Sequence, residues 1–83
     1  MFYIYAVYNK RNNKIYIGQT KNLEERLDLT RRKIFKTAYT AMFDGEWELI
    51  YKEEVQTRAE ALEREKQLKS YRGRQFIKKY IPL

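Results

Sequence analysis

Two short stretches of aromatic and β-branched residues open the chain, and they constrain its fold more than any other feature. The first stretch runs from Phe2 to Asn9, and the second runs from Lys14 to Gln19. Both have the composition of β-strands. Residues 9–13 between them, Asn-Lys-Arg-Asn-Asn, form a turn cluster, because asparagine tolerates the backbone conformations of tight turns. The segment therefore predicts a β-hairpin.

The alternation of side chains along this hairpin predicts which residues share a face. Side chains in a strand alternate between the two faces of a sheet. The residues expected to meet the core are Ile4, Ala6, Ile15 and Ile17. Tyr5 and Tyr16 then share the opposite face. Two interpretations remain open for them, because tyrosine is common in ordinary strands and is also a useful group in a functional site.

A helix is predicted directly after the hairpin. Asn22, followed three residues later by Glu25, is typical of a helix N-terminus, and Leu23 begins an apolar stripe. Arg26 lies beside that stripe, in the first turn, close to the end of the second strand. An arginine on a helix surface is usually just solvated, so this position alone leaves its role open. A basic face continues at residues 31–36.

The second half of the chain predicts one more strand and two helices. Trp47, Leu49 and Tyr51 alternate with charged residues, as in a half-buried strand that joins the hairpin. Thr57 with Glu60 is a capping signature for a helix from Arg58 to about Tyr71, which Gly73 is expected to end. A last helical segment is predicted over residues 75–80. The expected class is α+β, a three-stranded antiparallel sheet flanked by helices.

One acidic residue occupies an apolar position in the helix after Thr57. The inward stripe is formed by Ala61, Leu62 and Leu68, and Glu65 lies four residues after Ala61 on the same stripe. Removing an ionised carboxylate from water costs several kcal/mol unless a cation or hydrogen bonds compensate. A metal ion or Arg26 could compensate Glu65. Alternatively, Glu65 is a partly exposed acid at the edge of the stripe, paired with Lys69.

The charge of the chain favours a polyanionic partner. It has 18 lysine and arginine residues against 11 acids, a formal charge of +7 and a pI near 9.7. The segment from Ser70 to Leu83 contains basic residues and no acid. A basic surplus can also serve solubility alone. If the partner is DNA, the residues predicted to contact it are Lys21, Arg31, Arg32, Lys69, Arg72 and Arg74.

Composition also limits the type of metal ligand and the expected cellular location of the protein. The chain has no cysteine and no histidine, so a bound metal would need oxygen ligands, as Mg²⁺ or Mn²⁺ does. No apolar run approaches the roughly 20 residues of a membrane-spanning helix. A single domain over residues 1–83 is expected, acting in the cytoplasm and associated with the nucleoid when bound to DNA.

Four sets of residues resemble the GIY-YIG nuclease superfamily. They are Tyr3-Ile4-Tyr5, Tyr16-Ile17-Gly18, Arg26 and Glu65. The resemblance extends from Phe2 to about Tyr71 and is most specific over residues 14–27. It implies a three-stranded antiparallel sheet flanked by helices and metal-dependent cleavage of DNA, in contexts that include DNA repair.

The resemblance also implies a role for each matching residue. Glu65 would hold one divalent cation, Mg²⁺ or Mn²⁺, Tyr5 would help to activate the attacking water, and Tyr16 would orient that water or the phosphate. Arg26 would stabilise the charge of the transition state, and a partner protein or the structure of the DNA would supply selectivity. The chain departs from the family at Thr30, where many members have histidine or tyrosine. Two alternatives therefore stay open: a catalytically impaired nucleic-acid-binding module of the same fold, and a protein-interaction domain.

Overall fold

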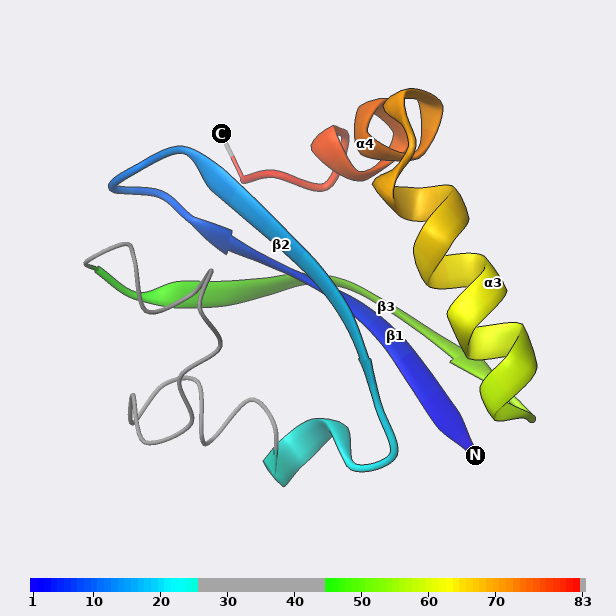
Figure 1. Cartoon of the computed structure of the whole chain (residues 1–83). Helices are drawn as coiled ribbons and strands as arrows, with labels where there is room; N and C mark the ends of the chain where they lie inside the picture. Colours follow the sequence, from blue (N-terminus) through cyan, green and yellow to red (C-terminus); the bar gives the residue numbers. More distant parts are fainter. Residues whose placement is uncertain (26–44, 83) are drawn as a thin grey trace.

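The computed structural model describes residues 1–25 and 45–82, which form a three-stranded antiparallel sheet and two helices (Figure 1). The strand order is β2-β1-β3, so the hairpin supplies the central strand and one edge strand. This arrangement confirms the predicted α+β class. The elements are β1 (Phe2–Asn9), β2 (Lys14–Thr20), β3 (Trp47–Val55), α3 (Arg58–Lys69) and α4 (Tyr71–Lys78). Among the described residues, no helix combines the length and hydrophobicity that crossing a membrane requires.

The turn of the hairpin is fixed by its asparagines. Asn13 has a φ of 53°, in the left-handed region that asparagine tolerates better than most residues, and its side chain accepts a hydrogen bond from Tyr8 Oη at 2.9 Å. Asn9 is fully buried, and its Oδ1 accepts from the backbone N–H of Asn12 at 3.0 Å. These bonds satisfy polar groups that would otherwise be costly inside the fold. The turn thereby sets the register of β1 against β2.

The two faces of the sheet carry separate apolar clusters, as the alternation predicted. The first face, called the helix face below, packs against α3 and α4; its buried cluster is Ile4, Ala6, Ile17, Ala61, Leu68 and Ile77. The second, called the tyrosine face, carries Tyr5, Val7, Leu23 and Trp47, with Tyr3, Tyr16 and Leu49 packed against them. Because both faces are covered, most of β1 is buried.

A β-bulge interrupts the alternation predicted for the third strand. Val7 pairs with Leu49, whereas Ala6 pairs with Tyr51, so Ile50 is an extra residue on β3. Leu49 therefore belongs to the tyrosine face and Tyr51 to the helix face. Trp47, Leu49 and Tyr51 were expected to share one face of the sheet, and that expectation was wrong for Tyr51.

Helix α3 begins as predicted and ends earlier than predicted. The backbone N–H of Glu60 donates to Thr57 Oγ1 at 3.2 Å, which confirms the N-cap. The helix stops at Lys69, not near Tyr71, because Ser70 has extended backbone angles. Ser70 is also the N-cap of α4, and its Oγ accepts from the N–H of Gly73 at 3.2 Å.

Gly73 lies inside α4 and does not terminate α3. A Cβ atom on Gly73 would lie 2.2 Å from the carbonyl oxygen of Gln67 and 2.4 Å from Leu68 Cα. Glycine therefore allows the first turn of α4 to pack directly on the last turn of α3. The predicted last helix exists, but it begins at Tyr71 and ends at Lys78, before the expected Tyr80.

Candidate active site

Two phenol groups lie side by side on the tyrosine face. The rings of Tyr5 and Tyr16 have centroids 6.3 Å apart and an interplanar angle of 49°. Tyr5 pairs across the strands with Gly18, and a Cβ atom on Gly18 would lie 2.9 Å from Tyr5 Oη and 3.0 Å from Tyr16 Cε2. The glycine thus leaves the space in which both rings lie. The structure brings together the two tyrosines that the sequence singled out.

The tyrosine pair lies at a boundary between the core and the surface. Tyr5 is only 2% exposed and packs with Val7, Leu23 and Trp47, whereas Tyr16 is half-buried. The apolar packing holds the ring of Tyr5 in place. Of the two rings, Tyr16 is therefore the more accessible to a substrate.

A helical turn follows β2 directly and covers part of this face. Residues 23–25 are helical, and the N–H of Glu25 donates to Asn22 Oδ1 at 3.0 Å, which confirms the predicted N-cap. Leu23 contributes to the apolar cluster around Tyr5. Arg26 is the next residue after this turn, but Arg26, Arg31 and Arg32 lie outside the described residues.

Glu65 lies on helix α3, which packs on the helix face of the sheet, whereas Tyr5 and Tyr16 lie on the tyrosine face. Successive residues of an α-helix are about 100° apart around its axis, so Arg64 and Glu65 flank the buried stripe of Ala61 and Leu68 on opposite sides. Arg64 faces β3, where it bonds Glu53. Because α3 packs on β1 and β2 as well, Glu65 lies on the flank turned toward β2.

The carboxylate of Glu65 is paired with a lysine. Lys69 Nζ lies 3.3 Å from Glu65 Oε2, and the Glu65 side chain is 20% exposed. This is the ion pair that the sequence left open as one explanation of the acid. Leu62, which was expected to face inward, is 48% exposed, so that expectation was wrong. The buried stripe is narrower than predicted, and Glu65 lies at its edge.

Within the described part of the chain, Glu65 does not belong to a ready-made metal site. Among the described residues, no group of three or more acidic side chains is placed to hold a metal ion. A single accessible carboxylate is nevertheless compatible with Mg²⁺, which keeps several waters and often binds through one or two carboxylates together with substrate phosphate. The donor set therefore fits a hard divalent cation that is completed by water and DNA.

The predicted site is brought together in part. Tyr5 and Tyr16 are neighbours on the tyrosine face, and Glu65 approaches β2 from the helix face. Since β2 is an edge strand, groups from the two faces can meet around its edge. Convergence of all four residues stays a prediction, because Arg26 lies outside the described part of the chain.

The described basic residues predicted to bind DNA are all exposed. Lys21 Nζ lies 5.9 Å from the centroid of the Phe2 ring. Lys69 is the partner of Glu65, and its carbonyl oxygen accepts from Arg74 Nε at 3.1 Å. Arg72 and Arg74 lie on α4.

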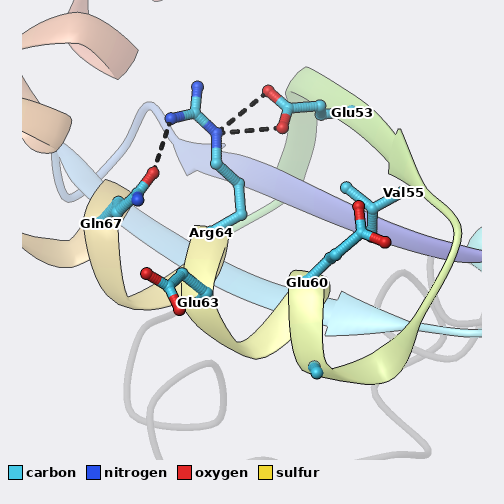
Figure 2. A pocket seen from close by; sticks show the side chains of 7 residues that line it. Glu53, Val55, Glu60, Glu63, Arg64 and Gln67 are labelled. Atoms are coloured by element: carbon cyan, nitrogen blue, oxygen red, sulfur yellow. Dashed lines mark hydrogen bonds and ion pairs between the residues drawn. The ribbon is translucent and has the colours of Figure 1, made fainter.

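A polar network between α3 and β3 was not predicted (Figure 2). Arg64 Nε donates to Glu53 Oε1 at 3.2 Å and to Oε2 at 3.0 Å, and Arg64 Nη1 donates to Gln67 Oε1 at 3.1 Å. Tyr51 Oη donates to the same Glu53 carboxylate. Burial and the hydrogen bond to Glu53 raise the pKa of Tyr51 above its ordinary value. Glu53 and Arg64 are eleven residues apart on different elements, so no local pattern could indicate this network.

Comparison with known proteins identifies the domain. The family model described as the GIY-YIG catalytic domain matches residues 1–80. Searches of curated proteins and of solved structures gave no significant match.

Proposed function

The chain belongs to the GIY-YIG catalytic domain family, and on this basis we propose that it is an endonuclease that hydrolyses DNA with the help of one divalent cation. The domain is a nuclease fold, generally that of endonucleases, and it implies DNA as the substrate. The observation that supports the proposal most is the pairing of Tyr5 and Tyr16 over Gly18. The absence of a side chain at Gly18 leaves room for both rings next to the edge strand β2.

The two phenols would act on the attacking water. Tyr5 would take part in its activation, and the more accessible Tyr16 would orient the water or the scissile phosphate. A free phenol titrates near pH 10, so Tyr5 can serve as a base near neutrality only where positive charge stabilises the phenolate. The packing of Tyr5 against Leu23 and Trp47 would fix the direction of its oxygen.

Glu65 would hold the divalent cation, Mg²⁺ or Mn²⁺. When bound, such a cation polarises the phosphate and stabilises the departing oxygen. Lys69 is the present partner of Glu65 and would remain beside it, where its ammonium group could contact a phosphate of the DNA. Arg26 would stabilise the additional negative charge of the transition state, an effect worth about 3–4 kcal/mol for comparable groups.

Selectivity would come from outside the catalytic groups. We propose low intrinsic sequence specificity, with DNA structure or a protein partner selecting the site of cleavage. The net charge of +7 supports binding through the phosphate backbone, which carries no sequence information directly. Action in the cytoplasm on nucleoid DNA is part of the same proposal, and a fluorescent fusion that failed to overlap with DNA would contradict it.

A cleavage assay tests the proposed function. Purified protein is incubated with supercoiled plasmid, flap and branched DNA in Mg²⁺, in Mn²⁺ and in EDTA. We expect nicking that requires the cation and falls by at least about 100-fold in Glu65→Gln. Glu63→Gln is the matched control, because Glu63 is exposed on the same helix and belongs to no proposed catalytic group. Folded protein that cleaves none of these substrates would overturn the proposal.

The second candidate is a nucleic-acid-binding module that has lost turnover. Thr30, which replaces the histidine or tyrosine of many family members, favours it. This candidate predicts binding without cleavage. With about five phosphates contacted, the logarithm of the affinity would fall with the logarithm of salt concentration at a slope of about −4 to −5.

A further inference from the structure

The outer face of α4 combines an exposed aromatic ring with cations. Tyr71 is 79% exposed. Residues three, four and seven positions later lie on the same face of a helix. For Tyr71 these are Arg74, Gln75 and Lys78, and all three are exposed. The exposed ring therefore shares its face of the helix with polar and positively charged residues.

The surrounding segment contains no acid that could neutralise this face. Residues 66–83 include no aspartate or glutamate, and their basic residues are Lys66, Lys69, Arg72, Arg74, Lys78 and Lys79. Among these, Lys69 has an ion-pair partner, Glu65 on α3. A surface of this charge attracts phosphate.

The apolar side of α4 is already occupied by the protein itself. Ile77 is fully buried in the cluster of the helix face. Phe76 lies edge-on to Tyr51 at 5.5 Å between ring centroids, and Tyr80 lies 5.0 Å from Tyr51. A helix that lies in a membrane needs a free apolar face, and α4 has buried its own. Its exposed side instead has one flat ring among charges.

The orientation of α4 is fixed, which makes its outer face a defined surface. Ser70 caps the helix, Gly73 packs on Gln67 and Leu68, and Arg74 Nε donates to Lys69 O. Figure 1 shows that α4 follows α3 directly and turns away from its direction. Little conformational freedom would be lost when a ligand binds there.

We propose that the outer face of α4 binds single-stranded nucleic acid, with Tyr71 stacking on an unpaired base and Arg74 and Lys78 contacting the flanking phosphates. Exposed aromatic rings stack on base faces, which a duplex hides between neighbouring pairs. The inference rests on the proposed function and narrows its substrate to DNA with a single-stranded part, such as a flap or an overhang.

Binding without cleavage tests this surface separately from the nuclease proposal. The Glu65→Gln protein in EDTA is titrated into labelled oligo(dT) and into a duplex of equal length, and fluorescence anisotropy gives both affinities. Tyr71→Leu removes the aromatic ring and keeps a residue that favours helices. We expect single-strand affinity to fall about 5- to 150-fold and duplex affinity to change less than about twofold. Tyr71→Phe keeps the ring and should retain binding.

Charge variants give an independent measurement. The slope of log affinity against log salt concentration should become less steep by about one in Arg74→Gln, for either nucleic acid. Lys10→Gln, on the β1–β2 turn, should leave this slope unchanged. Circular dichroism confirms that each variant is folded. Unchanged single-strand affinity in Tyr71→Leu, an equal loss for duplex, or tighter binding to anionic lipid vesicles than to oligo(dT) would overturn the inference. Each result is independent of whether the wild-type protein cleaves DNA.

Discussion

Arg64 Nε donates to both carboxylate oxygens of Glu53, at 3.2 and 3.0 Å, and this contact joins α3 to β3. Both side chains are partly exposed, yet Glu53 also accepts from Tyr51, and Arg64 donates to Gln67. The next residue, Glu65, lies on the opposite flank of the buried stripe, because successive residues of a helix are about 100° apart around its axis. The buried residues Ala61 and Leu68 set which side of α3 faces the sheet, and the contact to β3 adds to that packing on the flank away from the candidate metal ligand.

Removing this contact should loosen α3. Arg64→Met keeps much of the side chain's volume but loses both hydrogen bonds to Glu53, and we expect the free energy of unfolding to fall by about 1 kcal/mol. For a domain of this size that lowers Tm by about 4–8 °C, measured by thermal denaturation. Arg58→Met is the control, since Arg58 is exposed in the first turn of α3. Equal Tm values for the two variants would show that the network does not stabilise the helix.

Stability at high pH should depend on Tyr51. Burial and the hydrogen bond to Glu53 raise the pKa of Tyr51 in the folded protein. The folded state then holds the phenol proton more tightly than the unfolded state. This contribution is fully present below about pH 10, the unfolded pKa, and is lost as the pH rises through the folded pKa.

Tyr51→Phe isolates that contribution. The variant has no proton to lose at this position, so its stability should fall less steeply above about pH 10 than that of the wild type. Urea denaturation at a series of pH values from neutral to alkaline gives both curves. Tyr71→Phe is the control, because Tyr71 is exposed. Parallel curves for wild type and Tyr51→Phe would contradict the pKa shift.

Gly18→Ala should disturb the candidate site more than the fold. The added Cβ would lie 2.9 Å from Tyr5 Oη and 3.0 Å from Tyr16 Cε2, so at least one phenol must move. Displacements of about 1 Å in an active site can cost about 100-fold in rate. We expect a loss of that order in the cleavage assay, with a stability cost of about 1–3 kcal/mol. Full activity in folded Gly18→Ala would mean that the tyrosine pair does not act in catalysis.

Gly73→Ala, by contrast, should disturb the fold more than the candidate site. Here the added Cβ would meet backbone atoms of Gln67 and Leu68, at 2.2 and 2.4 Å, which cannot move independently. We expect a destabilisation of at least about 3 kcal/mol, since overpacking against fixed backbone exceeds the usual side-chain cost. Chemical denaturation measures it. Near-wild-type stability would show that α4 can shift away from α3 at little cost.

The sequence predicted the parts of the fold that depend on local patterns. The hairpin, the division between Ile4 and Tyr5, and the N-caps at Asn22 and Thr57 all follow from alternation or capping chemistry, and all are observed. The bulge at Ile50 was not predictable, because the extra residue is defined only by pairing with β1.

The parts that depend on tertiary contacts were missed or left open. Gly73 was expected to end a helix, since glycine commonly follows a helix C-terminus, but its function depends on the close approach of α4 to α3. Glu65 was identified from its helical phase, whereas the bond between Arg64 and Glu53 on the other flank of α3 was missed, because it joins two residues on different elements. By contrast, the side-by-side position of the Tyr5 and Tyr16 rings was predictable, because the alternation of the hairpin places both on one face.

Metal binding should stabilise the protein through Glu65. A ligand that binds only the folded state adds about 2.7 kcal/mol to the free energy of unfolding at one hundred times its Kd. We therefore expect Mn²⁺ to raise the Tm of the wild-type protein, and EDTA to reverse the increase. Glu65→Gln should lose this response, because a neutral amide is a weaker ligand for a hard cation. Glu63→Gln should keep it, since this neighbouring acid is exposed and lies away from the flank that faces β2. An equal Mn²⁺ response in both variants would place the cation elsewhere and remove Glu65 from the proposed mechanism.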